Sequence, residues 1–232
     1  MAALLVLRAV ALITVYGATS TVGSCPADIS IYRTSSVTGG DDGDGLDLMK
    51  MNGLWYEQAY IDLAQVGESC QVFNNTYLGE ASEDLGDGSD GVDGVGGVDG
   101  VDGHVMSSTS GIDQKFHVKY GPIPYTLPLH YDTTDQTGVF QRYAQYPGGK
   151  FLKFPSVVVD AVLSDDGTEY TSLSEYLCYM IGPIEYVEIR IATRGVSVTN
   201  DELEEMEDVL RGVGIQYDNL TYVDHNGCDP WP

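Results

Sequence analysis

Bulky and polar residues alternate with a period of two through much of the chain, in short runs separated by turn residues. This alternation is typical of half-buried β-strands. The expected strands are 55–63, 70–79, 116–120, 125–131, 139–145, 150–154, 156–163, 170–180 and 186–193. Turn signals such as Gly121-Pro122, Pro147-Gly148-Gly149 and Gly182-Pro183 separate several of them. Many short strands at even spacing predict a β-sandwich or a β-barrel.

One segment near the C-terminus has helical spacing instead. Thr199 and Glu202 form a capping box at its start, with acidic side chains at the positive end of the helix dipole. The apolar residues that follow lie on one stripe of a helix: Leu203, Met206, Val209, Leu210 and Val213. A short final strand is expected at 220–223. The pattern therefore predicts an all-β domain with a single amphipathic helix.

The N-terminus has the composition of a targeting segment. Residues 2–16 are almost wholly apolar, and small residues follow at 17–20. This predicts a secretory signal peptide over residues 1–24 and a mature, secreted domain over 25–232. A retained membrane anchor is the alternative, but the apolar run is short for a span of about 20 residues. No later segment of the sequence is long and apolar enough to cross a bilayer.

The cysteines and sequons agree with a secreted protein. The cysteines are Cys25, Cys70, Cys178 and Cys228. An even number in an oxidising compartment predicts two disulfides, for which three pairings are possible. The sequence has no Cys-x-x-Cys and no His/Cys cluster, so no metal site is expected. The sequons at Asn74 and Asn219 make both asparagines candidates for glycosylation.

The charge is strongly negative, with 35 acidic and 11 basic residues and a net charge of -24. Nucleic acids and anionic membranes would repel such a chain.

The Asp/Gly-rich tract 83–103 cannot offset its ordering cost by burial, so it predicts a disordered insert. Residues 25–48 are interpreted as a solvated linker. An alternative function follows from the tract: an extracellular acidic protein that binds calcium or associates with matrix.

Two stretches resemble the motifs of the lipocalins, small secreted β-barrels. Gly53-Leu54-Trp55-Tyr56-Glu57 resembles the first family motif, and Ile191-Ala192-Thr193-Arg194 resembles the third. The stretch 159–170 resembles the second motif only in part. The resemblance implies an eight-stranded antiparallel up-and-down barrel with one C-terminal helix packed outside. It also implies that Gly53, Trp55 and Arg194 close one end, with the arginine over the indole.

The cysteine positions resemble those of apolipoprotein D, insect bilin-binding protein and the crustacean pigment carriers. By that similarity the disulfides are Cys25–Cys178 and Cys70–Cys228. Lipocalins carry small apolar molecules in the barrel, so the resemblance implies a hydrophobic ligand such as a lipid, fatty acid, retinoid, carotenoid or bilin-like pigment. The expected state is a monomer or a weak homo-oligomer.

Strand periodicity then suggests residues that face the ligand. If Arg194 points into the barrel, Arg190, Glu188 and Tyr186 lie on the same inner side. The isoleucines between them face outward, where the helix could cover them. The hypothesis is that Arg190 orients a polar head such as a carboxylate, with Glu188 as its partner in the empty barrel. A plain ion pair is the alternative. Aromatic candidates for the lining are Tyr143, Phe154 and Tyr176.

No catalytic motif is present in the sequence. We find no nucleophile elbow, metalloprotease helix, P-loop or dinucleotide fingerprint. The four histidines lie in loops or are isolated within strand-like runs. The sequence therefore predicts a carrier with no catalytic residues and no cofactor, and an enzyme built on a lipocalin barrel is kept as an alternative.

Overall fold

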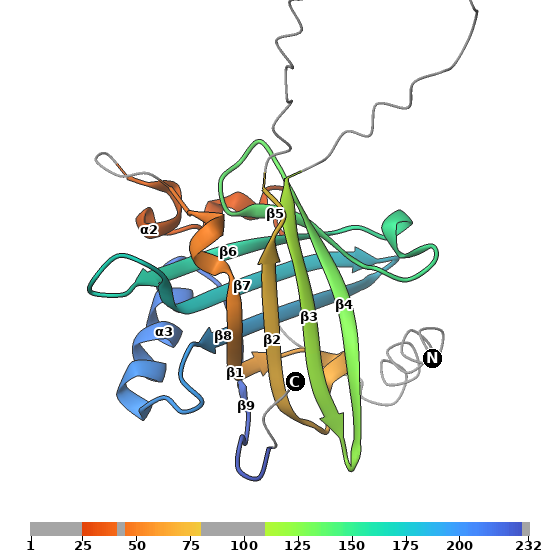
Figure 1. Cartoon of the computed structure of the whole chain (residues 1–232). Coiled ribbons are helices and arrows are strands. Elements are labelled where there is room, and N and C mark those ends of the chain that lie inside the picture. The colour runs from red at the N-terminus through yellow and green to blue at the C-terminus, as the bar shows by residue number, and fades with distance from the viewer. Residues whose placement is uncertain (1–24, 41–44, 80–109, 229–232) are drawn as a thin grey trace, which may run out of the picture.

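A closed antiparallel β-barrel forms the body of the protein in the computed structural model, which describes residues 25–40, 45–79 and 110–228 (Figure 1). Each strand pairs with the next, and β1 pairs with both β2 and β8, which closes the barrel. The eight strands are β1 (Gly53–Ile61), β2 (Glu68–Tyr77), β3 (Gly111–Tyr120), β4 (Ile123–Thr133), β5 (Val139–Ala144), β6 (Phe154–Leu163), β7 (Tyr170–Ile181) and β8 (Ile184–Thr193). The short β9 (Thr221–Tyr222) pairs with Ala59 and Tyr60, near the C-terminal end of β1.

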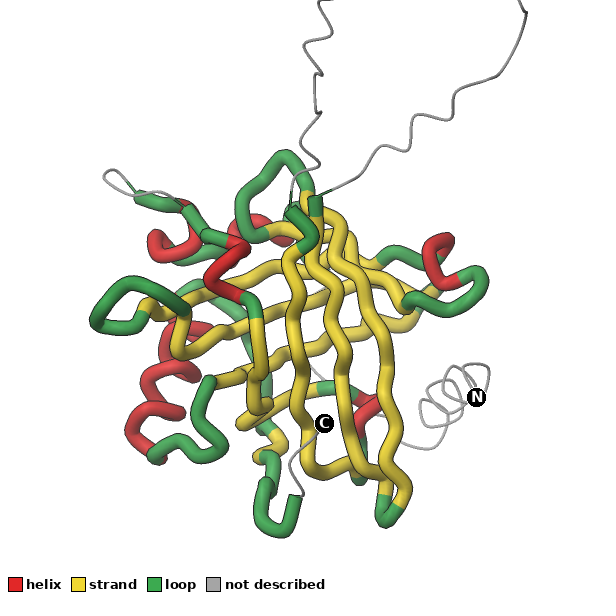
Figure 2. The backbone as a smooth tube through the Cα atoms, viewed as in Figure 1, coloured by secondary structure: helices red, strands yellow, loops and turns green. Residues whose placement is uncertain are grey.

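The predicted helix is α3 (Asn200–Gly212), and both hydrogen bonds of its capping box are formed. It lies against the outside of the barrel (Figure 2). Leu210 is fully buried in a cluster with Ile189 and Ile191, the outward-facing residues of β8. The helix therefore covers the strand face that the alternation in β8 left apolar.

The N-terminal segment is not a solvated linker, so that prediction is wrong for its described residues. It forms three short helices, η1 (Ile29–Tyr32), α2 (Ser35–Thr38) and η2 (Leu48–Met51). Val37 and Leu46 are buried in the same core cluster as Trp55. Single apolar residues among many polar ones give no periodic signal, yet here they seal one end of the barrel.

Two strand predictions need correction. The predicted strand 150–154 is wrong: Gly149–Phe151 form a 3-10 helix, and Phe154 begins β6. Phe151 is 79% exposed, so this aromatic residue lies in a loop and not in a strand of the barrel. β3 begins at Gly111 and not at 116. The prediction missed its first residues because the buried Gln114 interrupts the alternation of apolar and polar residues.

Two disulfides fasten the barrel, Cys25–Cys178 and Cys70–Cys228, the pairing that the resemblance implied. The first joins the N-terminal segment to β7, and the second joins the start of β2 to the chain beyond β9. The predicted signal peptide and the Asp/Gly-rich tract 83–103 lie outside the described residues. Within the described ranges, no helix combines the length and apolar character needed to span a bilayer.

Candidate functional site

One end of the barrel is closed by a stacked cation and indole. The Arg194 guanidinium carbon lies 3.8 Å from the centre of the Trp55 ring. Trp55 is fully buried, and its Nε1 donates to the Met51 carbonyl at 2.9 Å. Arg194 donates to four backbone carbonyls, those of Lys50, Asn52, Leu54 and Tyr170. This is the arrangement of Gly53, Trp55 and Arg194 that the sequence resemblance implied, and these contacts cover this end of the barrel.

The middle of the barrel is occupied by Arg190, which is 2% exposed. Its guanidinium carbon lies 4.9 Å from the Phe73 ring centre and 5.1 Å from that of Phe116. Its Nη1 donates to Gln114 Oε1 at 3.1 Å and to the Tyr131 hydroxyl at 3.3 Å. An arginine buried this deeply requires such partners, because taking its charge out of water is costly.

Three carboxylates surround the same guanidinium. Glu175 lies 3.2 Å from Nη1, Glu188 lies 3.5 Å from Nη2, and Glu57 lies 3.7 Å from Nε. Arg142 also contacts Glu188, with Nη1 2.6 Å from Oε1. The small space between Arg142, Glu175 and Glu188 has no room for a water molecule. Side chains therefore fill the central layer around Arg142, Glu175 and Glu188.

Five inward-facing side chains at the open end are only partly buried. They occupy register positions opposite inward residues of neighbouring strands. They are Tyr125, Leu127, Ala144, Phe154 and Tyr179. The Phe154 and Tyr179 ring centres are 4.3 Å apart, and Tyr179 lies 4.9 Å from Tyr186. Together these five residues form a largely apolar, partly exposed inner surface at this end of the barrel, and we call this region the cup.

Acidic residues lie inside the cup, with Asp62 and Glu68 toward its mouth and Glu57 deeper, at its base. Asp62 accepts a hydrogen bond from the Tyr186 hydroxyl, and Glu68 accepts one from the Tyr125 hydroxyl. Burial raises the pKa of Glu57 to about 8, that of Glu68 to about 8 and that of Asp62 to about 6. The cause is the same in each case, since low-dielectric surroundings disfavour the charged form.

Several polar atoms at this base are buried without a hydrogen-bond partner among the described residues. They include both carboxyl oxygens of Glu57, Oε1 of Gln71 and Oε2 of Glu68. In the β1–β2 ladder Trp55 pairs with Phe73 and Tyr56 with Val72, so continuing this register places Glu57 opposite Gln71. Buried polar groups are nearly always hydrogen-bonded, so this group of acceptors needs a donor.

Exposed apolar residues surround the mouth of the cup. In an up-and-down barrel the β1–β2, β3–β4, β5–β6 and β7–β8 connections share one end. Each of these connections carries a pair of exposed large apolar side chains: Leu63 and Val66, Tyr120 and Ile123, Phe151 and Leu152, Met180 and Ile181. Contiguous exposed apolar surface commonly marks a binding region.

The structure separates the ligand-binding residues predicted from the sequence into two groups. Tyr186, Glu188 and Arg190 point into the barrel, and Phe154 lies in the cup wall. Tyr143 and Tyr176 do not line the interior, so the prediction is wrong for these two. Tyr143 pairs across the outer face with His130, and Tyr176 packs against Tyr32 of the N-terminal segment. The aromatic content of a strand does not reveal which face each ring occupies.

Sequence reasoning missed the acidic base of the cup. A signal was available in β1, because Glu57 follows Trp55 by two residues and therefore shares its inner face. Asp62 and Glu68 flank a loop, where periodicity says nothing. The candidate glycosylation sites Asn74 and Asn219 are both exposed, and their modification stays a prediction.

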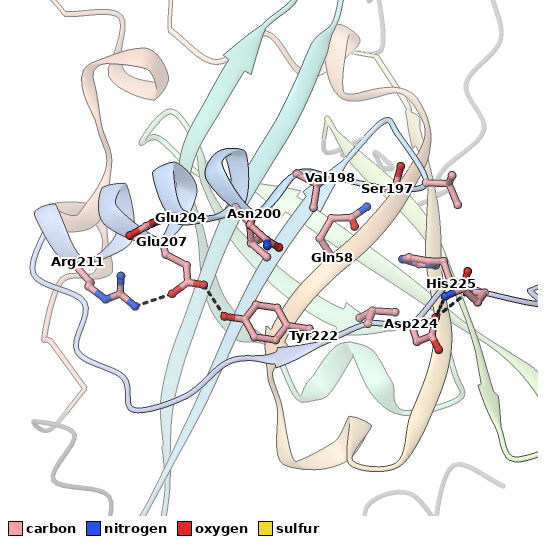
Figure 3. Close-up of a pocket in the computed structure, with 14 residues that line it drawn as sticks. Gln58, Ser197, Val198, Asn200, Glu204, Glu207, Arg211, Tyr222, Asp224 and His225 are labelled. Carbon is pink, nitrogen blue, oxygen red and sulfur yellow. Dashed lines mark hydrogen bonds and ion pairs between the residues drawn. The ribbon is translucent and has the colours of Figure 1, made fainter.

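A groove of about 740 Å³ lies outside the barrel between α3, the 196–198 loop and the chain after β9 (Figure 3). Its polar side chains largely pair with one another. Glu207 accepts from Arg211 at 2.6 Å and from the Tyr222 hydroxyl at 3.0 Å. Gln58 donates to Thr193 Oγ1 at 2.9 Å, whereas Nδ1 of His225 in the same groove is buried without a hydrogen-bond partner among the described residues.

No protein-family model matches the sequence, and no curated protein sequence matches it. Solved structures do match the fold. Apocrustacyanin C1 and apocrustacyanin C2 each align with a TM-score of 0.50 and 10% identity over 77% of this chain and 79% of theirs. Insecticyanin from the tobacco hornworm Manduca sexta aligns with a TM-score of 0.50 and 12% identity over 78% of this chain and 82% of its own. With its closed eight-stranded meander, outer helix and Arg194–Trp55 closure, the chain has the lipocalin fold.

Proposed function

We propose that this protein binds and carries a small molecule with an apolar body, held in the cup at the open end of the barrel. The observation that carries the proposal is the partly exposed inward wall of Tyr125, Leu127, Ala144, Phe154 and Tyr179. Core residues of a solid barrel would be covered by their neighbours, whereas these five retain contact with solvent. A barrel of eight strands has room for one small ligand.

The surroundings of the cup support this role. The opposite end is sealed by Arg194 over Trp55, so ligand can enter and leave at one end only. The apolar pairs on the four mouth loops give a ligand a surface to cross between water and the cup. The motif resemblance to lipocalins implies the same kind of ligand. The two disulfides support secretion, because such bonds persist in oxidising compartments.

Arg190 is not assigned to a ligand carboxylate in this proposal. Glu57, Glu175 and Glu188 already surround its guanidinium, and Gln114 accepts one of its hydrogen bonds. A ligand carboxylate would have to displace one of them and would add a negative charge to an acidic interior. The geometry favours the alternative named from the sequence, a structural ion pair.

The test is titration with N-phenyl-1-naphthylamine, an uncharged apolar probe whose emission rises in apolar surroundings. We expect saturable binding at one site per chain. Tyr179→Ala should weaken binding by about tenfold, since removing a buried aromatic contact costs about 1.4 kcal/mol or more. Tyr143→Ala is the matched control, because the same ring is removed from the outer face and affinity should stay unchanged.

Two results would reject the proposal: an absence of saturable binding, or an equal loss of affinity in Tyr143→Ala and Tyr179→Ala. If binding is confirmed, mass spectrometry of an organic extract of protein from its native source would identify the bound molecule directly. The alternatives named from the sequence, an acidic calcium-binding or matrix protein and a lipocalin-fold enzyme, stay predictions.

A further inference from the structure

We propose that the base of the cup recognises a protonated amine, so that the carried molecule is a cationic amphiphile with an ammonium group attached to an apolar or aromatic body. This inference rests on the proposed function and names the ligand class of the same site.

The described interior contains more carboxyl groups than cations. Five carboxyl groups point inward: Glu57, Asp62, Glu68, Glu175 and Glu188. Two guanidinium groups, those of Arg142 and Arg190, point inward with them. Both are already engaged, Arg142 by Glu188, and Arg190 by Glu57, Glu175 and Glu188. An added cation can be balanced by ionising one of these carboxyl groups, whereas an added anion would meet only guanidinium groups that are already paired.

Asp62 and Glu68 have no ion pair among the described residues. Each instead accepts a hydrogen bond from a tyrosine hydroxyl, that of Tyr186 and that of Tyr125 respectively. Both tyrosines face the cup, so the two carboxyl groups lie where a ligand in the cup can reach them. They are the acidic groups nearest to the open end.

Most of the buried atoms without a hydrogen-bond partner among the described residues of this region are acceptors; the donor Nε of Arg190, 3.7 Å from Glu57 Oε1, is the exception. Glu57 is fully buried, and within the described part of the chain neither of its carboxyl oxygens has a hydrogen-bond partner. Gln71 is also fully buried, and its amide nitrogen donates to Gln65, which leaves its oxygen unpaired. Glu68 contributes one further unpaired oxygen. An ammonium group offers three donors and a positive charge, whereas a carboxylate offers only acceptors.

Aromatic rings surround these acceptors. Tyr60, Tyr125, Tyr179 and Tyr186 line the cup and its base together with Phe154. The Tyr60 hydroxyl donates to the Gln65 carbonyl at 3.0 Å, which holds its ring in place beside Gln71. The faces of such rings attract cations, and a cation shielded from water gains more from them than one on the surface.

The protonation of the empty site agrees with this chemistry. Because burial raises the pKa of Glu57 and of Glu68 to about 8, both are largely neutral at pH 7 when no ligand is bound. A bound ammonium favours the ionised carboxylate and lowers its pKa. Binding should therefore release protons to solvent, and affinity should rise between pH 6 and pH 8.

The experiment compares three ligands that share an indole body: tryptamine, tryptophol and indole-3-propionic acid. Isothermal titration at pH 7.5 should show tryptamine binding at least about tenfold more tightly than tryptophol, with the acid weakest. Repeating the tryptamine titration in buffers of different ionisation enthalpy should reveal proton release. Glu57→Gln and Glu68→Gln should each weaken tryptamine by about tenfold and leave tryptophol unchanged.

Glu205→Gln is the matched control, since it neutralises an exposed acid on α3 and should leave the affinity for tryptamine unchanged. Glu68→Gln keeps the test valid if Glu57→Gln fails to fold, because Glu68 is only partly buried. If tryptophol or the acid binds as tightly as tryptamine, the amine inference is wrong while the carrier function stands. If Glu57→Gln and Glu68→Gln both leave tryptamine binding unchanged, the unpaired oxygens serve only ordered water and the inference also fails. If N-phenyl-1-naphthylamine and tryptamine both fail to bind, the proposed function fails with it.

Discussion

The guanidinium of Arg194, at the end of β8, lies 3.8 Å from the ring centre of Trp55, near the start of β1. The pair joins two strands that are neighbours in the barrel but far apart in the sequence. The same guanidinium donates to the carbonyls of Lys50 and Asn52, which lead into β1. A single side chain thus connects the closing strand, the first strand and the segment that covers this end.

Arg194→Ala should lower the free energy of unfolding by about 3 kcal/mol, because it removes the cation–π contact and leaves partly buried carbonyls without a donor. Arg194→Lys should recover only part of this loss, since an ammonium cannot reproduce the planar fork that reaches several carbonyls. Urea denaturation monitored by circular dichroism measures both. Arg211→Ala is the control, and removing this half-exposed arginine should cost less than about 1 kcal/mol. Equal losses at 194 and 211 would contradict this account.

Gly53→Ala should destabilise the same end of the barrel. Gly53 has φ of +96°, a conformation that is strained for other residues, and an added Cβ would lie 3.2 Å from Arg194 Nη1. Gly167→Ala is a matched comparison, because Gly167 has φ of +70° and open space where its Cβ would be. We expect about 1 kcal/mol for the backbone strain at Gly167 and a larger loss at Gly53. The excess should disappear when both glycine variants are measured in an Arg194→Ala background.

Removing either disulfide should be costly. Cys25 and Cys178 are separated by 153 residues, and Cys70 and Cys228 by 158. For loops of this length the chain-entropy model gives about 5 kcal/mol for each bridge. Paired alanine substitutions, studied by urea denaturation, should show losses of similar size for the two bridges. A loss below about 1 kcal/mol for either pair would mean that the bridge constrains the unfolded chain far less than its loop length implies.

The stability of the protein should fall as the pH rises from about 5 to about 8. Burial raises the pKa of Glu57 to about 8 from an ordinary value of 4.5, and Arg190, which faces it, offsets this only in part. Glu188, Asp62 and Glu175 also face Glu57, and their negative charges add to the rise. The native state therefore holds a proton in this window that the unfolded chain has lost, so each rise in pH favours unfolding.

Glu57→Gln keeps the shape of the side chain and removes its titration. It should reduce the pH dependence, leaving the part due to Glu68 and Asp62, and stabilise the protein at pH 8 relative to the wild type, by up to about 1.4 kcal/mol for each pKa unit of the shift. Thermal or urea unfolding at pH 5, 6.5 and 8 measures this slope. Glu205→Gln, an exposed change, should leave the slope as it is. A wild-type slope that persists in Glu57→Gln would show that other groups bind the proton.

Local patterns determined the elements of this fold with few errors. The capping box at Thr199 and Glu202 and the apolar stripe that follows predicted α3, because a helix signals its start and its buried face within a dozen or so residues. Period-two alternation placed Arg190, Glu188 and Tyr186 on the inner face of β8, which pairs regularly with β7 along its whole length. Where a strand is regular, the sequence alone determines which side each residue faces.

A β-bulge changes which side of the sheet the following residues face, so alternation in the sequence no longer predicts it. In β1 the pairing with β8 shifts between Glu57 and Ala59, so Ala59 faces the outer cluster, although counting by two from Trp55 would place it inside. A similar shift occurs in β6 between Val158 and Asp160. These irregularities arise from how neighbouring strands fit together, and the residues of one strand do not reveal them.

The sequence by itself determined most of the strands and the helix, and its motif resemblance identified Trp55 and Arg194 as the residues that close the barrel. Only the tertiary structure decided that the N-terminal segment seals one end, that Arg190 and its carboxylates fill the middle and that the cup is confined to the open end. The reason is physical: an element's periodicity is set by its own backbone geometry, whereas the filling of a barrel depends on side chains brought together from all eight strands. The acidic character of the cup also depends on the tertiary structure, because Glu57, Asp62 and Glu68 come together only when β1 and β2 are paired.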